Sequence, residues 1–250
     1  MIFDQFLLAT SVLTRLPVAP KTDGLAPEEG AVAEASWAFP VVGAGIGMIA
    51  AIVLFLASMC GLGETASALL ALVAAGFTTG ALHEDGLADT ADGLGGGRTR
   101  EDKLAIMRDS RQGTYGILAL ILSIGLRAAA LASIPGPIEA GLALIAAHAA
   151  SRATLPIVMR WLVPARDDGL GAAAGTPGPI AMLVALAIGI FVAIGMLGPV
   201  RGPVALVLMG MPVAAMAALA RRQIGGYTGD VLGALQQIGE IVMLLVASAK

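Results

Sequence analysis

The chain has 250 residues, of which 57% are hydrophobic and 13% are charged. So few polar side chains could not cover a water-facing surface, so the composition excludes a single soluble domain and favours an integral membrane protein. The net charge is only −3 and the basic residues form short clusters without interleaved aromatic residues, so we expect no nucleic-acid binding. Cys60 is the one cysteine, which excludes an internal disulfide and cysteine-based zinc sites.

The hydrophobic segments predict an all-α, polytopic integral membrane protein with a single membrane domain over residues 1–250. Residues 3–16 are short and mixed, which predicts an N-terminal helix that is interfacial or re-entrant. A transmembrane helix needs about 20 apolar residues, because its backbone must be hydrogen-bonded within the segment. About seven transmembrane helices, separated by turns rich in Gly and Pro, are predicted at residues 38–61, 65–83, 115–134, 138–162, 178–198, 202–220 and 228–248.

The distribution of Lys and Arg predicts which side of the membrane each connection faces, because cytoplasmic loops carry the excess. With the N-terminus in the cytoplasm, only Arg201 and Lys250 fall outside, and Arg127 and Arg152 fall within spans. The other basic residues fall on the cytoplasmic side: Arg15, Lys21, Arg98, Arg100, Lys103, Arg108, Arg111, Arg160, Arg166, Arg221 and Arg222. This asymmetry supports the predicted topology.

The longest polar connection, residues 83–116, is predicted to be a catalytic loop on the cytoplasmic side. It contains Asp85, Asp89 and Asp92 at i, i+4 and i+7, so a helix continuing from the second span would carry three carboxylates on one face. Like charges at this spacing repel one another, so a cation should offset them. Carboxylates without cysteine or a paired histidine favour a hard ion such as Mg²⁺, which binds one or two carboxylates together with substrate phosphates.

Glycines and a short helix follow this acidic row. We expect Gly93 and the glycines at 95–97 to break the helix and to let a phosphate-bearing ligand approach the backbone closely. Thr99 and Asp102 resemble a capping box, which predicts a short helix over residues 100–109. Asp109 would end this helix, where the helix dipole favours a cation over a carboxylate. A ligand role therefore explains this aspartate better than local helix stability does. The alternative is that these acids and the neighbouring basic residues form a solvated, mutually paired loop.

Ionisable residues within the spans need partners, because a charge at bilayer depth costs about 2.5–3.5 kcal/mol on insertion scales. We expect Arg127 and Glu240 to form a structural pair and His148 to be a hydrogen-bonded core residue. Two roles stay open for Arg152, which either pairs across helices or contacts substrate phosphate. Asp230 likewise is either a helix N-cap or a contact to a nucleotide or a metal.

The polar segment at residues 83–116 resembles the signature of the cobalamin synthase family, the adenosylcobinamide-GDP ribazoletransferases. The likeness includes the acidic segment and shows no departure at its acidic positions. It continues through most of the chain, in Phe6-Leu7, residues 13–17 (LTRLP), residues 39–43 (FPVVG), Ser151-Arg152 and residues 225–233 (GGYTGDVLG). A signature of this length and order is specific.

The resemblance implies a Mg²⁺-dependent phosphoryl transfer in the last step of nucleotide loop assembly of vitamin B12. α-Ribazole, or its 5′-phosphate, would react with adenosylcobinamide-GDP to give adenosylcobalamin, or its phosphate, and GMP. The implied setting is the lipid bilayer of a bacterial or archaeal cell membrane, crossed several times, with the active site on the cytoplasmic side. Whether copies of the chain form a homo-oligomer is left open.

The resemblance also implies roles for particular residues. The catalytic and metal-binding residues would be Asp85, Asp89, Asp92 and Asp109. The substrate-binding residues would be Arg108, Arg111, Arg152, Gly93, Gly113 and Asp230. Spacing does not identify which aspartate acts as the general base, and Arg108 and Arg111 would serve equally well as positive-inside anchors. The rival functions are a transporter or channel and a membrane scaffold; acids clustered at one membrane face, without a visible inverted repeat, disfavour a transporter.

Overall fold

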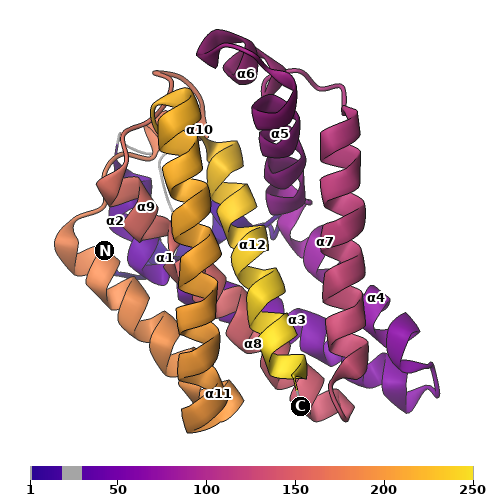
Figure 1. The fold of residues 1–250 in the computed structure, drawn as a ribbon. Coiled ribbons are helices and arrows are strands. Elements are labelled where there is room, and N and C mark those ends of the chain that lie inside the picture. The colour runs from indigo at the N-terminus through magenta and orange to yellow at the C-terminus, as the bar shows by residue number, and fades with distance from the viewer. Residues whose placement is uncertain (1, 19–29, 250) are drawn as a thin grey trace.

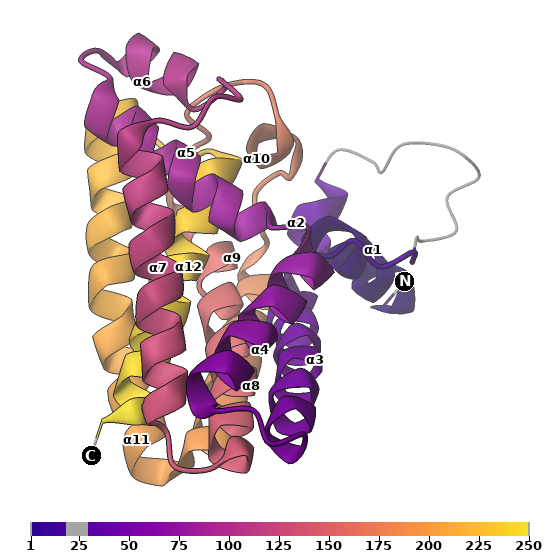
Figure 2. The same cartoon turned by 90° about the vertical axis from the view of Figure 1, so that its right-hand side faces the viewer.

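The computed structural model describes residues 2–18 and 30–249, and helices form nearly all of its regular structure (Figures 1 and 2). An isolated backbone bridge joins Pro164 to Tyr227. The all-α prediction is therefore confirmed. Lys21 and Lys250, which the topology prediction placed on opposite sides of the membrane, lie outside the described residues.

Five helical segments of the described chain are long and apolar enough to cross a membrane. They are Ala31–Met59, which joins α2 (Ala31–Ala35), η1 (Ser36–Ala38) and α3 (Phe39–Met59); α7 (Thr114–Ser133); Pro137–Trp161, which joins α8 (Pro137–Ala153) and α9 (Leu155–Trp161); α11 (Pro179–Ile224); and α12 (Gly229–Ser248). A sixth crossing is formed if α4 (Glu64–Thr79) and α5 (Leu82–Gly96) make one broken span. The expected multi-pass architecture is thus present, and the predicted number of seven was approximate.

The difference in number arises mainly at α11, which runs for 46 residues. Gly198 interrupts it with φ 84° and ψ 171°, which is not helical, and Figure 1 shows the chain reversing direction there. Gly202 then packs against the arm before the break, since a Cβ built on it would lie 2.8 Å from the Ile194 Cα. The predicted spans 178–198 and 202–220 are therefore the two arms of a helical hairpin.

The second predicted span, residues 65–83, is bent rather than straight. α4 ends at Thr79, α5 begins at Leu82, and the two helices meet at 90°. Gly80 and Ala81 both have left-handed backbone conformations, with φ 66° and φ 57°. Glycine adopts this conformation readily and stops a helix, so the bend follows from local chemistry. The expectation that α5 continues the second span was wrong, and the acidic row lies on a separately directed helix.

The short helices differ from the prediction at their ends. α5 runs through Gly93 and stops only at Gly96, so Gly93 does not break it. The capping box of Thr99 and Asp102 is confirmed, with each residue's backbone N–H bonded to the other's side chain. The helix that it opens, α6 (Arg100–Ile106), ends three residues before the predicted position. α10 covers Leu170–Ala173.

The N-terminal helix α1 covers Ile2–Leu13, which is too short to cross a bilayer alone. It packs against α2 and α3, beside the bend between α4 and α5 (Figure 2). An interfacial or re-entrant position for this helix stays a prediction.

The core of the bundle is the contact between α3 and α8. Residues 143–156 are all buried, so the central helix of the fold is enclosed by its neighbours. Gly43 and Gly47 of α3 lie directly against its backbone, with a Cβ on Gly47 reaching 2.7 Å from the Ile145 Cα. Small residues let membrane helices approach closely, which strengthens their packing when the hydrophobic effect between helices is absent.

Replacing Gly43 by Ala should destabilise the protein by about 1–3 kcal/mol, because the new methyl group would overlap the backbone of His148. Gly45→Ala is the matched control, since that glycine is exposed on the same helix and has open space around it. Thermal unfolding in detergent should show a lower Tm for Gly43→Ala and an unchanged or slightly higher Tm for Gly45→Ala. Equal Tm values would contradict close α3–α8 packing.

Candidate active site

The acidic row lies on α5, and its three members differ in burial. Asp85 is exposed, Asp89 is half-buried and Asp92 is buried. The negative charges of Asp85, Asp92 and Asp230 all act on the carboxyl group of Asp89. The structure therefore brings together three of the predicted acids with a fourth, Asp230, from another helix.

Two glycines make this meeting of α5 and α12 possible. A Cβ on Gly86 would lie 2.8 Å from the Asp230 carbonyl oxygen and 3.2 Å from the Cα of Gly233. Because neither glycine has a side chain, the two backbones cross closely, and Asp230 lies beside the segment between Asp85 and Asp89.

Asp230 is not the N-cap of α12. That position belongs to Thr228, whose hydroxyl oxygen accepts a hydrogen bond from the Val231 N–H at 3.2 Å. The same hydroxyl lies 3.1 Å from Asp230 Oδ2 and donates to it. The N-cap alternative for Asp230 was therefore wrong, and its carboxylate is directed by Thr228 instead.

Asp92 binds the beginning of α7. One carboxylate oxygen accepts the Gly113 N–H at 2.7 Å and the other accepts the Gly116 N–H at 2.9 Å. The first backbone N–H groups of a helix have no partner within the helix, so a carboxylate from α5 replaces a local N-cap. Gly113 was predicted to bind substrate. The structure gives another reason for a glycine at this position, because a Cβ there would lie 2.5 Å from Asp92 Oδ1.

Asp109 lies in the loop between α6 and α7 and binds Arg111. Its carboxylate accepts hydrogen bonds from the Arg111 backbone N–H at 3.0 Å and from Nη2 at 2.6 Å. These hydrogen bonds lower the pKa of Asp109 to about 2. The loop reaches the acidic row through Gln112, whose side-chain amide lies 3.3 Å from Asp89 Oδ1. Asp109 itself is thus already paired with a cation.

The donor chemistry of the row suits Mg²⁺, but the row is not a complete metal cage. Within residues 2–18 and 30–249, no three His, Cys, Asp or Glu side chains are arranged to hold one metal ion. Mg²⁺ commonly uses one or two protein carboxylates and completes its shell with water and substrate phosphate. Asp85 and Asp89 fit that kind of site, because both stay accessible next to one another on α5.

The other predicted phosphate contacts also have protein partners. Arg108 Nη2 lies 2.5 Å from Asp168 Oδ1, and Arg111 pairs with Asp109. Arg152 is almost fully buried; its Nη1 lies 3.0 Å from His148 Nδ1 and its Nη2 lies 3.5 Å from His83 Nδ1. Arg152 therefore sits below the acidic row, inside the bundle.

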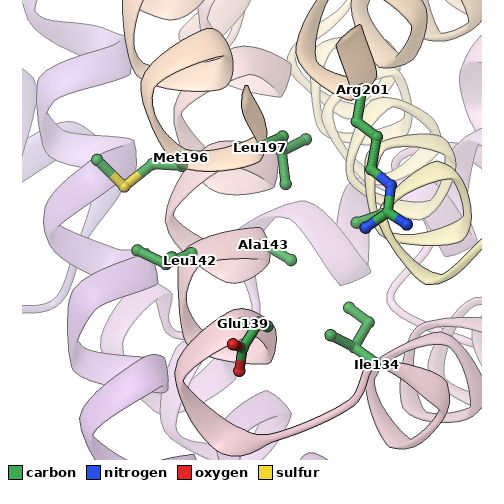
Figure 3. A pocket seen from close by; sticks show the side chains of 8 residues that line it. Ile134, Glu139, Leu142, Ala143, Met196, Leu197 and Arg201 are labelled. Atoms are coloured by element: carbon green, nitrogen blue, oxygen red, sulfur yellow. The ribbon is translucent and has the colours of Figure 1, made fainter. Parts of the chain in front are cut away.

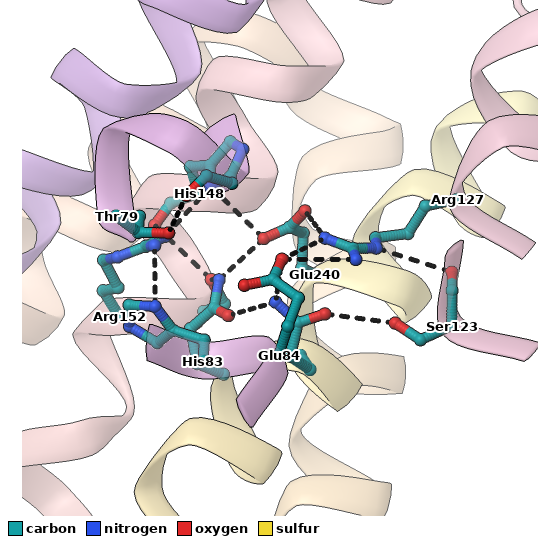
Figure 4. Close-up of polar contacts among 12 residues, drawn as sticks. Thr79, His83, Glu84, Ser123, Arg127, His148, Arg152 and Glu240 are labelled. Carbon is teal, nitrogen blue, oxygen red and sulfur yellow. Dashed lines mark hydrogen bonds and ion pairs between the residues drawn. The ribbon is translucent and has the colours of Figure 1, made fainter. Parts of the chain in front are cut away.

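A buried polar network fixes the start of α5 (Figure 4). Arg127 Nη1 lies 2.9 Å from Glu240 Oε1, which confirms the predicted pair, and 3.3 Å from Glu84 Oε1. Glu240 Oε2 lies 3.2 Å from His148 Nδ1, so His148 is a core residue with polar partners, as expected. Gln236 and Gln237 of α12 extend the network to Glu240 and Glu84. Side chains from α5, α7, α8 and α12 are joined in this way.

The family is shown by sequence comparison. The sequence model of the family described as cobalamin-5-phosphate synthase matches residues 5–248. The chain belongs to this family. No solved structure matches it.

Relatives named adenosylcobinamide-GDP ribazoletransferase match over nearly the whole chain. One from Bradyrhizobium diazoefficiens is 53% identical over 242 residues, which cover 97% of this chain and 92% of the relative. One from Mesorhizobium japonicum is 48% identical and covers 99% of this chain and 93% of the relative. One from Azorhizobium caulinodans is 44% identical, with coverage of 92% and 89%. These matches agree with the resemblance seen in the sequence motifs.

One cavity of this cobalamin-5-phosphate synthase family member lies away from the acidic row. This cavity, of about 180 Å³, lies between α7, α8, α11 and α12, beside the turns at Ile134 and Arg201, at the end of the bundle opposite to α6 (Figures 1 and 3). Ligand pockets usually have about 300–1,000 Å³. This cavity is smaller than a usual ligand pocket and lies at the opposite end of the bundle from α6, so it does not belong to the acidic row.

Sequence reasoning missed three features of the site. Glu84 was treated only as part of the polar connection. On α5 it lies one residue before the exposed Asp85, so its side chain points to another side of the helix and contacts Arg127 in the bundle. Asp92 was not predicted to cap α7, because a cap from another helix leaves no local spacing. Arg166 entered only as a positive-inside residue, although it precedes Asp167 and Asp168 in a short polar segment. That local charge pattern was the available signal.

Removing the Asp92 carboxylate should loosen the start of α7. Asp92→Ala loses two charge-assisted hydrogen bonds, and each contributes about 1.5–3 kcal/mol. We expect a lower Tm in detergent and faster hydrogen exchange or proteolysis at residues 107–116. Glu101→Ala, an exposed acid on α6, should change neither measurement. Unaltered exchange at residues 107–116 in the Asp92 variant would show that the cap is unimportant.

Removing one charge of the buried network should destabilise the bundle strongly. Arg127→Met leaves Glu240 buried without its cation, which typically costs about 3–5 kcal/mol. The double variant Arg127→Met/Glu240→Gln should recover part of this loss, because it removes the uncompensated carboxylate. Tm values in detergent provide the measurement. A double variant that is less stable than the single one would argue against a charge-compensating pair.

Proposed function

We propose that the chain is an adenosylcobinamide-GDP ribazoletransferase that acts at the end of the bundle formed by α5, α6 and the start of α12. The observation that carries the proposal is the row of Asp85 and Asp89 beside Asp230, in a chain that matches the family over residues 5–248. The proposed substrates are adenosylcobinamide-GDP and α-ribazole or its 5′-phosphate. The products are adenosylcobalamin, or its phosphate, and GMP.

The proposed reaction is a phosphoryl transfer. The 5′-hydroxyl oxygen of α-ribazole attacks the phosphorus attached to the cobinamide arm and forms a new P–O bond. The P–O bond to the GMP part breaks, and GMP leaves with its electron pair. The hydroxyl proton passes to an aspartate of the acidic row. Such a reaction asks the protein mainly to align the two reactants and to stabilise the phosphate charge.

Asp85 and Asp89 are the proposed ligands of Mg²⁺, which when bound would neutralise charge on the diphosphate. Asp92 holds the glycine turn before α7 against the row, and each of its oxygens keeps a second lone pair for a ligand. Asp109 can contribute a carboxylate once Arg111 is drawn away from it. Asp230 completes the acidic surface from α12.

We place the acidic end of the bundle on the cytoplasmic side. Arg98, Arg100 and Lys103 gather around α6 at this end, whereas Arg201 lies in the turn region at the other end. Cytoplasmic connections carry the excess of Lys and Arg, which supports this orientation. A site on that side would be reached by nucleotide-linked substrates without crossing the bilayer.

Asp89→Ala should abolish transfer while leaving the fold intact. Asp89 is half-buried beside three other carboxylates, so its removal relieves repulsion and the Tm should stay equal or rise. Protein in liposomes, supplied with adenosylcobinamide-GDP, α-ribazole and Mg²⁺, is assayed for GMP release. Glu101→Ala serves as the control and should retain wild-type turnover.

A chelator provides the second arm of the same assay. Excess EDTA should stop GMP release by the wild-type protein, and added Mg²⁺ should restore it. Wild-type turnover in Asp89→Ala, or undiminished turnover in EDTA, would contradict the metal assignment. Absence of GMP release by folded wild-type protein would contradict the proposed activity itself.

A further inference from the structure

The segment that carries Arg166 is fixed to the turn before α12. This segment connects α9 to α10, and its Ala165 N–H donates to the Tyr227 carbonyl oxygen at 2.8 Å. In return, the Tyr227 N–H donates to the Val163 carbonyl oxygen at 3.0 Å. Gly226 lies so close to Val163 that a side chain would not fit between them. Two backbone hydrogen bonds therefore hold the position of Arg166 relative to α12.

A second set of contacts closes the same junction. Arg100 of α6 donates from Nε to the Ile224 carbonyl oxygen at 2.9 Å and from Nη2 to that of Ala165 at 2.5 Å. The Tyr227 hydroxyl donates to the Gly171 carbonyl oxygen at 3.2 Å. These contacts join α6, the segment of Arg166 and the start of α12, and they fix the backbone just before Arg166.

The guanidinium of Arg166 has donors without close partners. Its Nη2 lies 3.5 Å from Asp230 Oδ2, and its Nε lies 3.7 Å from Asp168 Oδ1. Both distances exceed the usual 2.7–3.2 Å of N–H···O hydrogen bonds. Its Nη1 is buried and has no hydrogen-bond partner among the described residues. Burying an unpaired donor is costly, so a ligand oxygen at this position would satisfy an unmet requirement.

Arg166 also stands next to the acidic row. Its partner Asp230 lies against Gly86, between Asp85 and Asp89, and the charges of Asp85 and Arg166 both act on Asp230. A cluster of carboxylates repels a diphosphate, so a bound diphosphate needs positive charge from the protein as well as from a metal. Arg108 and Arg111 are bonded to carboxylates at 2.5 Å and 2.6 Å, which leaves Arg166 more weakly engaged than either.

We propose that Arg166 is a substrate-binding residue that donates hydrogen bonds to non-bridging oxygens of the diphosphate in the GDP-linked substrate. This inference rests on the proposed function. In the free protein Arg166 pairs loosely with Asp230. When the diphosphate binds beside Asp85 and Asp89, the Arg166 side chain turns from Asp230 to the diphosphate oxygens.

The planar fork of arginine matches two oxygens of a phosphate, whereas lysine offers a single point charge. Arg166→Gln should therefore raise KM for adenosylcobinamide-GDP and lower kcat/KM for it by about 10- to 100-fold. KM for α-ribazole should change little. Arg166→Lys should retain the charge and recover only part of the loss. Arg222→Gln, an exposed arginine at the end of α11, is the control and should behave as wild type.

A double-variant cycle separates substrate binding from a structural ion pair. If Arg166 serves only to neutralise Asp230, the effect of Arg166→Gln on KM disappears when Asp230 is already Asn. The proposal predicts that KM for the GDP-linked substrate rises again in Arg166→Gln/Asp230→Asn relative to Asp230→Asn alone. Disappearance of the effect in the Asn background would overturn it.

Binding of GDP with Mg²⁺, measured by calorimetry, gives a readout that does not require turnover. Affinity should fall about 10-fold or more in Arg166→Gln and stay unchanged in Arg222→Gln. If Arg166→Gln fails to fold, Arg166→Lys takes its place, and wild-type affinity and KM in that variant would refute the inference. Normal transfer by wild type with wild-type values in the Arg166 variants refutes this inference alone, whereas inactive wild-type protein refutes the proposed function.

Discussion

The ion pair of Arg127 and Glu240 is the interaction on which the arrangement of the site depends. Both side chains are buried in a bundle of membrane helices, where an unpaired charge is strongly unfavourable. Glu84 binds the same guanidinium, so the first turn of α5 is tied to α7 and α12 at once. The helix that carries the acidic row therefore cannot rotate or slide without separating buried charges.

Close glycine contacts between α5 and α12 then determine which side chains meet at the surface. Gly86 and Gly233 let α5 and α12 cross closely, which brings Asp230 to the acids of α5. Asp92 then fixes the first turn of α7 through two backbone N–H groups. Several like charges are thus gathered on packed helices, an unfavourable arrangement that the proposed binding of a cation and a phosphate would explain.

The sequence predicted what depends on local pattern. Apolar runs marked the helices, the spacing of Thr99 and Asp102 marked a capping box, and the need of Arg127 for a buried partner pointed to Glu240. It did not predict the bend at Gly80 and Ala81, because the apolar run ends there whether the next helix continues or turns. The Asp92 cap and the position of Arg166 depend on residues distant in the chain, and only the charged run at residues 166–168 marked the second of them in the sequence.

The bend also depends on a helix outside the main bundle. The backbone N–H of Arg15, just after α1, donates to the Thr78 carbonyl oxygen at 2.8 Å, and the Arg15 side chain covers Gly80. The N-terminal helix thus supports the bend between α4 and α5, which sets the direction of α5. The C-terminus, by contrast, lies at the end of the bundle opposite to α6 (Figure 1). Changes at the N-terminal helix would therefore act on the direction of α5, although α1 contributes no residue to the acidic row.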